Sequence, residues 1–341
     1  MNRAKPKVTF LVLFVLLGFA LLAGVAIGPV GIPFGKSLLI LTNELPWLNI
    51  SGLPGNFQTI VFDLRLPRVF TGLLVGGSLA LSGTVMQGIF RNPLATPYIL
   101  GVASGGSAGA ATVVVLGFTS NFALPIGALI GALTAVTVVY RISWSRGSSS
   151  SYTLILAGVA LSSLFSAITT ALIFVAGPYQ QHRVLFWMMG GLWRSSWTLF
   201  KILLPIVTVG AGIIFAWSRD LNALALGESA AAHLGVKPET VKKTLLGLAT
   251  AITAVSVAAA GSIGFVGLVI PHIMRMILGP DHRILLPAAA LGGGVFLVYT
   301  DVMAKTIMQP VEMPVGVITA FFGAPFFLYL LRKKIVGGRM R

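Results

Sequence analysis

The sequence contains no cysteine, which excludes disulfide bonds, thiol nucleophiles and metal sites built on thiolates. It is also poor in charge, because Asp, Glu, Lys and Arg make up only 9% of the 341 residues, against roughly 25% in soluble domains. No segment is polar enough to cover a core built from a chain that is 56% hydrophobic. A soluble protein is therefore excluded, and the composition predicts an integral membrane protein.

Acidic residues are the scarcest charged class, with eight Asp and Glu beside 24 Lys and Arg. All eight fall in predicted loops or near the ends of predicted helices, so no carboxylate pair is placed mid-membrane for acid–base catalysis or proton relay. The four histidines are scattered and lack the spacing of a metal site. The sequence therefore predicts neither a membrane enzyme nor an ion-driven carrier, and it predicts no catalytic residue, metal or cofactor on this chain.

The net charge of +16 raises nucleic-acid binding as one interpretation. The basic residues sit in short loops between apolar runs, which is the pattern that the positive-inside rule describes for membrane proteins. We therefore expect contact with membrane lipid and no nucleic-acid partner. The same rule places both termini in the cytoplasm and the protein, as a multi-pass chain, in the cytoplasmic (inner) membrane.

A helix needs about 20 apolar residues to cross a bilayer, and apolar runs close to this length recur along the chain. They predict an all-α polytopic fold of about ten transmembrane helices, one of them short or broken, in a single domain over residues 1–341. The predicted segments are 8–28, 69–90, one beginning near 98, 124–140, 152–176, 201–217, two within 244–274, 283–302 and 314–331. A cleaved signal peptide is the alternative for the first run, but that run is longer than a usual signal-peptide core, which favours an uncleaved helix.

Residues 244–274 cannot hold two complete spans. Lys242, Lys243 and Arg275 are all expected inside, so the chain must leave and return within this segment, whereas two full spans need about 40 residues. The glycines between Gly261 and Gly267 mark the break. We expect a broken or half-length helix that is buried in protein, because irregular backbone at membrane depth must not face lipid.

Two further features indicate a function. Ser162, Ser166 and Thr169 recur at spacings of four and three and share one helix face, which either lines an aqueous path or bonds to neighbouring helices. Residues 218–243 form the largest inner loop, where we expect two short helices and a turn near residues 235–238. This loop either binds a cytoplasmic partner or packs on the chain itself.

Three motifs carry a family resemblance: RLPR at 65–68, GGSLALSG followed by Gln87 at 76–87, and RNPLATP at 91–97. This combination resembles the permease family of binding-protein-dependent (type II) ABC importers for iron-siderophores, haem and vitamin B12. Further matches extend the resemblance over nearly the whole chain. It implies a homodimer of permeases, two cytoplasmic ATPase subunits that hold ATP and Mg, and an extracytoplasmic substrate-binding protein.

The resemblance also assigns site residues. Binding-protein docking is expected at Arg65, Arg68 and Lys305, with membrane anchoring and an i,i+4 ion pair from Lys305 to Asp301 as the alternatives. The ATPase-coupling motif matches Gly227, Glu228, Ala231, Leu234 and Gly235. The cytoplasmic gate matches Asn92, Leu94 and, more loosely, Ser151 and Tyr152.

The expected function is import of a large metal chelate by alternating access, with the helix that carries Ser162, Ser166 and Thr169 as the pathway wall. An iron-siderophore or haem is the first expectation for the cargo, and cobalamin is the alternative. A secondary carrier without an ATPase and a non-transporting scaffold are the rival classes. The missing intramembrane carboxylate argues against the carrier, and the polar helix face argues against the scaffold.

Overall fold

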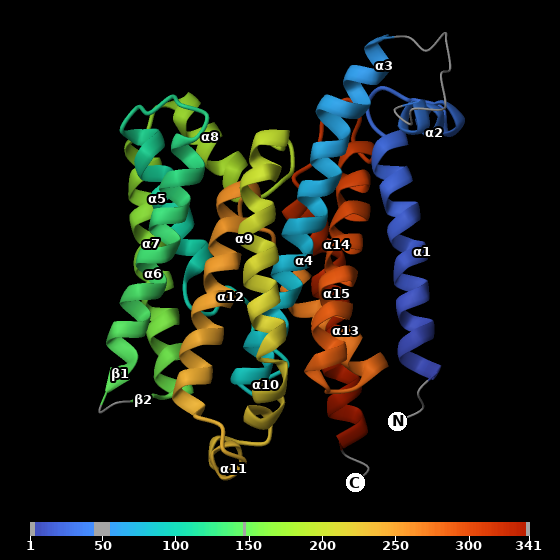
Figure 1. The fold of residues 1–341 in the computed structure, drawn as a ribbon. Coiled ribbons are helices and arrows are strands. Elements are labelled where there is room, and N and C mark those ends of the chain that lie inside the picture. Colours follow the sequence, from blue (N-terminus) through green and yellow to red (C-terminus); the bar gives the residue numbers. More distant parts are fainter. Residues whose placement is uncertain (1–3, 44–54, 146–147, 339–341) are drawn as a thin grey trace.

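The structure, a computed structural model, describes residues 4–43, 55–145 and 148–338. Its long helices run side by side along one axis, and the N- and C-terminal ends lie at the same end of the bundle (Figure 1). Residues 1–3 and 339–341, at the two termini expected in the cytoplasm, lie outside the described residues.

Ten apolar helices make up the bundle within the described residues, and the predicted all-α fold is confirmed. Seven are long enough to cross a membrane: α1 (Ala4–Ala26), α4 (Leu66–Ile89), α6 (Ala123–Ser143), α7 (Ser151–Val175), α9 (Trp197–Ala216), α12 (Pro238–Ala260) and α14 (His282–Thr306). Three have shorter apolar stretches: α5 (Val102–Val115), α13 (Val266–Leu278) and α15 (Val315–Gly338).

Short elements lie at the two ends of the bundle (Figure 1). The end opposite the termini carries α2 (Phe34–Asn43), α3 (Gly55–Thr59) and α8 (Pro178–Met188), and the π-helical turn η1 (Ile60–Arg65) joins α3 to α4. The end with the termini carries α10 (Ser218–Ala225), α11 (Glu228–His233) and a small hairpin of β1 (Trp144–Ser145) and β2 (Ser148–Ser149). The two short helices expected in the large loop are therefore present.

Helix α4 is the centre of the bundle and packs on α9, α12, α13 and α14. Its glycines let neighbouring backbones approach closely, as small residues do inside membranes. At Gly83 an added Cβ would lie 1.8 Å from the carbonyl oxygen of Gly267 on α13, so no larger residue fits there. At Gly76 an added Cβ would lie 2.3 Å from the carbonyl oxygen of Gly293 on α14.

The broken segment is real, but its boundaries differ from the prediction. Helix α12 begins at Pro238, ahead of the predicted run, and is therefore a complete span of 23 residues. The chain then turns at Gly261, and α13 is a half-length helix of 13 residues. The turn is buried in protein, and the Tyr98 hydroxyl donates to the Ile263 carbonyl at 2.7 Å, which satisfies backbone polarity away from lipid.

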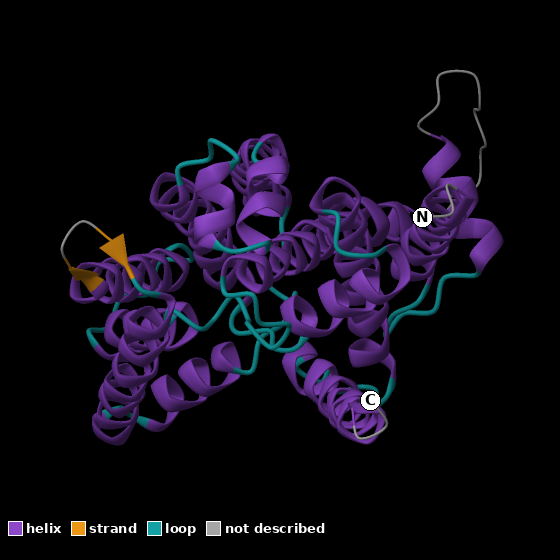
Figure 2. Ribbon diagram, turned by 90° about the horizontal axis from the view of Figure 1, so that it is seen from below, coloured by secondary structure: helices purple, strands orange, loops and turns teal. Residues whose placement is uncertain are grey.

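Seen from the end that carries the termini, the helices form an arch with loops in its middle (Figure 2). The C-terminal helix α15 forms one arm of the arch. Helix α7 packs mainly on α5 and α6 and makes a smaller contact with α8, and only 11% of the residues in its most apolar stretch are buried. The corresponding share for the helix that contains α4 is 83%.

Candidate functional site

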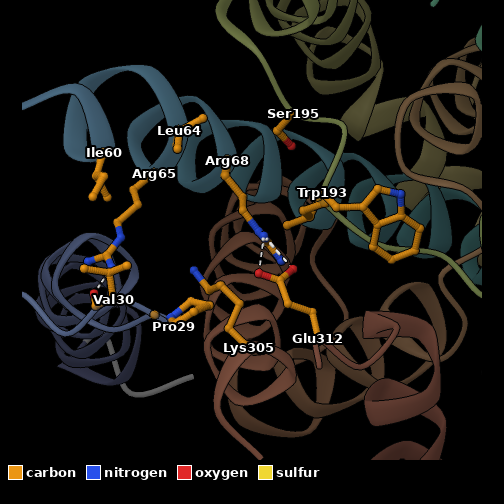
Figure 3. A pocket seen from close by; sticks show the side chains of 12 residues that line it. Pro29, Val30, Ile60, Leu64, Arg65, Arg68, Trp193, Ser195, Lys305 and Glu312 are labelled. Atoms are coloured by element: carbon orange, nitrogen blue, oxygen red, sulfur yellow. Dashed lines mark hydrogen bonds and ion pairs between the residues drawn. The ribbon is translucent and has the colours of Figure 1, made fainter. Parts of the chain in front are cut away.

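The three predicted docking cations lie together at the end opposite the termini. Arg65, Arg68 and Lys305 line one cavity of about 290 Å³, although Lys305 is distant from the arginines in sequence (Figure 3). Loop residues near Pro29 and the side chain of Trp193 complete the wall. The structure thus brings the three named residues to one cavity and shows how their charges are held, while their docking role stays a prediction.

Arg65 points into its own chain. Its guanidinium donates to the carbonyl oxygens of Val25 and Ala26, the last residues of α1, and to that of Val30. A cation at a helix C-terminus satisfies the last carbonyls and opposes the negative end of the helix dipole. Because the side chain is only 6% exposed, Arg65 secures α1 to α4, and a docking role for it stays a prediction.

Arg68 is held by two carboxylates. Its Nε and Nη2 donate to Asp301 Oδ1 at 3.1 and 2.9 Å, and Nη1 donates to Glu312 Oε2 at 2.9 Å. The Asp301 side chain is 3% exposed, whereas Glu312 is 28% exposed and lies at the rim of the cavity (Figure 3). No spacing rule links Glu312 to Arg68, so the sequence could not have identified this partner.

Lys305 makes the i,i+4 ion pair that the sequence offered as the alternative to docking. Its Nζ lies 3.1 Å from Asp301 Oδ2, and both side chains are almost fully buried. The charged cluster at the cavity, with the buried Asp301 included, therefore contains three cations against two carboxylates, so one positive charge is left uncompensated within the cluster. An acidic group entering the cavity would be attracted to that excess charge.

The predicted coupling motif forms a separate structure at the opposite end. Gly227 and Gly235 bracket α11 with positive φ angles of 120° and 82°, a backbone conformation that favours glycine. Ala231 is fully buried against its own chain, whereas Leu234 is 65% exposed. Leu226, which directly precedes Gly227 and was not among the assigned coupling residues, is 70% exposed. The exposed apolar surface of this motif is therefore formed by the two leucines and not by Ala231.

Polar contacts join this end to the membrane helices. Lys242 Nζ, buried on α12, lies 3.1 Å from Glu228 Oε1 at the start of α11. Asn222 on α10 donates to Asp281 Oδ1 at 2.8 Å and accepts from the His282 amide at 2.9 Å. These bonds fix α11 to α12 and α10 to α14.

Asp281, which caps α14, is a charged partner in this connection. Its carboxylate accepts hydrogen bonds from the Arg283 side chain and from Asn222, and these bonds hold the pKa of Asp281 well below its usual range. The carboxylate is therefore ionised at any physiological pH. Asn222 lacks a sequence signature, because its role depends on a loop 59 residues away.

The predicted gate residues lie at the same end as the coupling helices. Asn92 Oδ1 accepts from the Leu94 amide at 2.9 Å, which shapes the proline-bracketed turn, and Leu94 is 44% exposed. Ser151 begins α7, and Tyr152 beside it is 71% exposed. A constriction formed by these two pairs stays a prediction.

The polar face of α7 is partly open. Ser162 and Ser166 line a groove of about 590 Å³, together with Ser163 and with Thr96 and Tyr98 of the adjoining turn. Thr169 does not belong to this lining, because it is 3% exposed and its hydroxyl donates to the Phe165 carbonyl one turn earlier.

The hydroxyl bonds of α7 also bear on the alternative reading of its polar face. Ser163 and Thr170 donate to carbonyls of α7 itself, as Thr169 does, and therefore do not join α7 to another helix. For Ser162 and Ser166, which line the groove, a role in the translocation path stays a prediction.

Comparison with known proteins places these features in context. The sequence profile of the FecCD transport family matches residues 15–333. The cobalamin import system permease protein BtuC of Halobacterium salinarum is 42% identical over 91% of this chain and 88% of its own length. The hemin transport system permease protein HmuU of Yersinia pestis is 35% identical over 98% of both chains. A solved metal-chelate type ABC transporter in an inward-facing conformation superposes with a TM-score of 0.84 at 33% identity, covering 96% of this chain and 99% of that chain.

Proposed function

This chain belongs to the FecCD transport family, and we propose that two copies of it form the membrane channel of an ATP-driven importer for a bulky metal chelate. The observation that carries the proposal is the match to permease subunits of ABC importers along nearly the whole chain. The arrangement of the two ends supports it, since an apolar docking surface at one end is connected to the spans and a charged cavity lies at the other.

The energy for transport enters, in this proposal, through an ATPase on the cytoplasmic side. Leu226 and Leu234 supply an exposed apolar surface. Exposed apolar patches on proteins mark sites of interaction with other proteins. The bonds from Glu228 to Lys242 and from Asn222 to α14 would carry movement of the docked subunit into the bundle. ATP and Mg would be bound by that subunit, which this chain joins on the end that carries both termini.

A binding protein is proposed to dock at the opposite end, over the cavity lined by Arg65, Arg68 and Lys305. Arg65 and Lys305 are buried, so they would act through their positive electrostatic potential and by holding neighbouring residues in place. Arg68 would exchange its rim partner Glu312 for a carboxylate of the incoming protein. Such charge complementarity steers association and fixes register more than it adds affinity.

The translocation path is proposed to run along α7, where a second copy would cover the open face. Within the described residues, α7 combines bulky exposed apolar side chains with the groove lined by Ser162 and Ser166. Apolar contacts suit a subunit interface, and the hydroxyls suit a hydrated path that binds its cargo weakly enough to release it.

The cargo is proposed to be an iron-siderophore or haem, with cobalamin as the second candidate. A relative named for hemin aligns over almost the full length, whereas relatives named for cobalamin or vitamin B12 are more similar over shorter spans. All three ligands are large chelates, so a path of one width would admit each of them. Selection would then be made by the binding protein.

Uptake in a deletion strain tests the proposal. Labelled iron-siderophore, haem-iron and cobalamin are each supplied with the gene absent, restored, or restored beside an ATPase subunit that cannot hydrolyse ATP. We expect loss of one cargo, recovered only with an active ATPase. Uptake that persists with the inactive ATPase and collapses with the proton gradient would instead establish a secondary carrier. Undiminished uptake of all three would argue against these cargoes.

The docking surface is tested by the double variant Leu226→Ser and Leu234→Ser. We expect normal folding, because both side chains are exposed, but at least a tenfold fall in transport-coupled ATP hydrolysis in reconstituted importer. The matched control is Leu116→Ser, since Leu116 is 67% exposed and lies beyond α5 at the other end. Equal coupling in the double variant and the control would refute this docking surface.

A further inference from the structure

A second groove lies away from the α7 face, between the lower halves of α6 and α12. It has a volume of about 370 Å³ and lies on helices that pack directly on each other. Apart from its charged residues, the groove is lined largely by apolar or small residues, including Leu100, Val136, Leu246 and Gly247. None of the roles described above uses this groove, so its occupant is unassigned.

Two cations stand in the wall of this groove. Arg141, near the end of α6, and Lys243, near the start of α12, both line it and are exposed. Among the described residues neither has a carboxylate within ion-pair distance. The adjacent residue Lys242 differs completely, since it is buried and paired with two glutamates. The groove therefore presents positive charge that the chain itself does not neutralise.

The depth of the groove matches the boundary between acyl chains and headgroups. In the sequence, Arg141 lies between Tyr140 and Trp144. The rings of these two residues are 5.6 Å apart, and Trp144 is 41% exposed. Tyr and Trp concentrate at this boundary because they join an apolar ring to a polar group. Arg141 and Lys243 lie where α6 ends and α12 begins, at the end of the bundle that carries the termini, which the proposed orientation places at the cytoplasmic leaflet (Figure 1).

The apolar part of the groove has room for a hydrocarbon chain. Gly247 leaves its side of α12 bare, and an added Cβ there would meet no atom within 4 Å. The surrounding wall offers much more apolar than polar surface, so it has few hydrogen-bonding partners for water. A ligand that fits must therefore join an apolar tail to an anionic head.

We propose that the groove between α6 and α12 binds an anionic phospholipid of the cytoplasmic leaflet. Its phosphate lies between Arg141 and Lys243, and one acyl chain runs along Val136, Leu246 and Gly247. The inference rests on the membrane orientation proposed above and not on the identity of the cargo. Attraction of an anionic headgroup by a basic residue corresponds to about fivefold in affinity per cation, so the pair is expected to contribute about 25-fold.

Native mass spectrometry of the purified full-length chain tests the proposal. The protein is titrated with phosphatidylglycerol or phosphatidylcholine, and the lipid-bound fraction is measured for wild type, Arg141→Gln with Lys243→Gln, and Gly247→Leu. The charge control is Lys201→Gln with Arg219→Gln, two exposed cations outside the groove. The glycine control is Gly212→Leu on α9, where an added Cβ also meets nothing within 4 Å.

We expect wild type to prefer phosphatidylglycerol by at least tenfold in its tightest site. The charge variant should lose that preference, Gly247→Leu should lose tight binding of either lipid, and both controls should behave as wild type. Equal phosphatidylglycerol binding in all five proteins would overturn the proposal. Loss in the charge variant alone, with displacement by inorganic phosphate, would indicate a phosphate site without an acyl chain and would also overturn it.

Discussion

Helices α4 and α7 are both apolar and similar in length but have opposite surroundings. They contain 24 and 25 residues, and both combine apolar side chains with serine and threonine. In the span containing α4, 83% of the most apolar stretch is buried, whereas the share for α7 is 11%. Hydropathy therefore identifies both as membrane helices but does not distinguish the centre of the bundle from its open face.

The difference lies in what their small and polar residues contact. On α4, Ser78 Oγ lies 2.6 Å from Ser256 Oγ of α12, Ser82 donates to the Ala249 carbonyl, and Gln87 donates to the Leu268 carbonyl of α13. On α7 the hydroxyl bonds of Ser163 and Thr170 return to α7 itself. Crossing bonds hold α4 in one position, whereas α7 keeps its outer face available to a partner or a path.

The largest effect is expected at the closest backbone approach of α4. Gly83→Val should abolish recovery of folded protein, because the added carbons would overlap the Gly267 carbonyl. The measurement is the monodisperse fraction of a fluorescent fusion after detergent extraction. Gly212→Val, at an open helical glycine of α9, should give the wild-type yield. Equal yields from both variants would mean that the bundle can separate α4 from α13.

The next effect is expected where α4 begins. Arg68→Gln should lower the free energy of unfolding by about 3 kcal/mol, because it deprives the buried Asp301 of its principal hydrogen-bond donor. Lys201→Gln removes an exposed cation and should change it by less than about 0.5 kcal/mol. Unfolding in mixed micelles measures both values. A matching stability for the two variants would show that Lys305 alone compensates Asp301.

On α7 the same kind of change should affect transport rather than stability. Ser162→Leu with Ser166→Leu should leave the unfolding midpoint unchanged but slow uptake several-fold, since bulky apolar groups would enter the groove that both serines line. Thr170→Leu, outside this lining, should leave uptake normal. If the double variant transported at the wild-type rate, α7 would have no part in the path.

The smallest effect is expected for single hydroxyls. Ser78→Ala should lower the free energy of unfolding by about 0.6 kcal/mol, the average for a hydrogen bond between membrane helices. Ser163→Ala should have no measurable effect, because its hydroxyl bonds to its own helix on an exposed face. The same unfolding assay compares the two. A larger loss at Ser163 would show that α7 is covered in the assembled protein.

Much of the architecture was predictable because it depends on local properties of the chain. The apolar runs indicated ten segments, the prolines around Leu94 ended a helix, and the glycines after Ala260 marked the broken span. Boundaries were less accurate, since α12 extends back to Pro238 through residues that looked like loop. Charges near a span end do not stop a helix here, because Lys242 is paired with glutamates and Lys243 is exposed.

The roles of the named site residues stay predictions, and the structure adds environments that the motifs did not indicate. The family motifs brought Arg65, Arg68 and Lys305 to one cavity, yet the structure alone shows Arg65 capping α1. Ala231 was expected at the partner surface and is buried, while Leu226 is exposed without having been singled out. A motif gives residue types at fixed spacing, and the direction of a side chain depends on which neighbours pack against its helix.

The sequence by itself determined that this is a multi-pass helical membrane protein of one transport family, because composition, hydropathy and motif spacing are properties of the linear chain. The tertiary structure decided which of two adjacent lysines, Lys242 or Lys243, is paired and which faces a groove. It also decided that α4 is enclosed and α7 is open. These outcomes depend on contacts between segments far apart in sequence, where burial and partner charge set the free energy of every polar group.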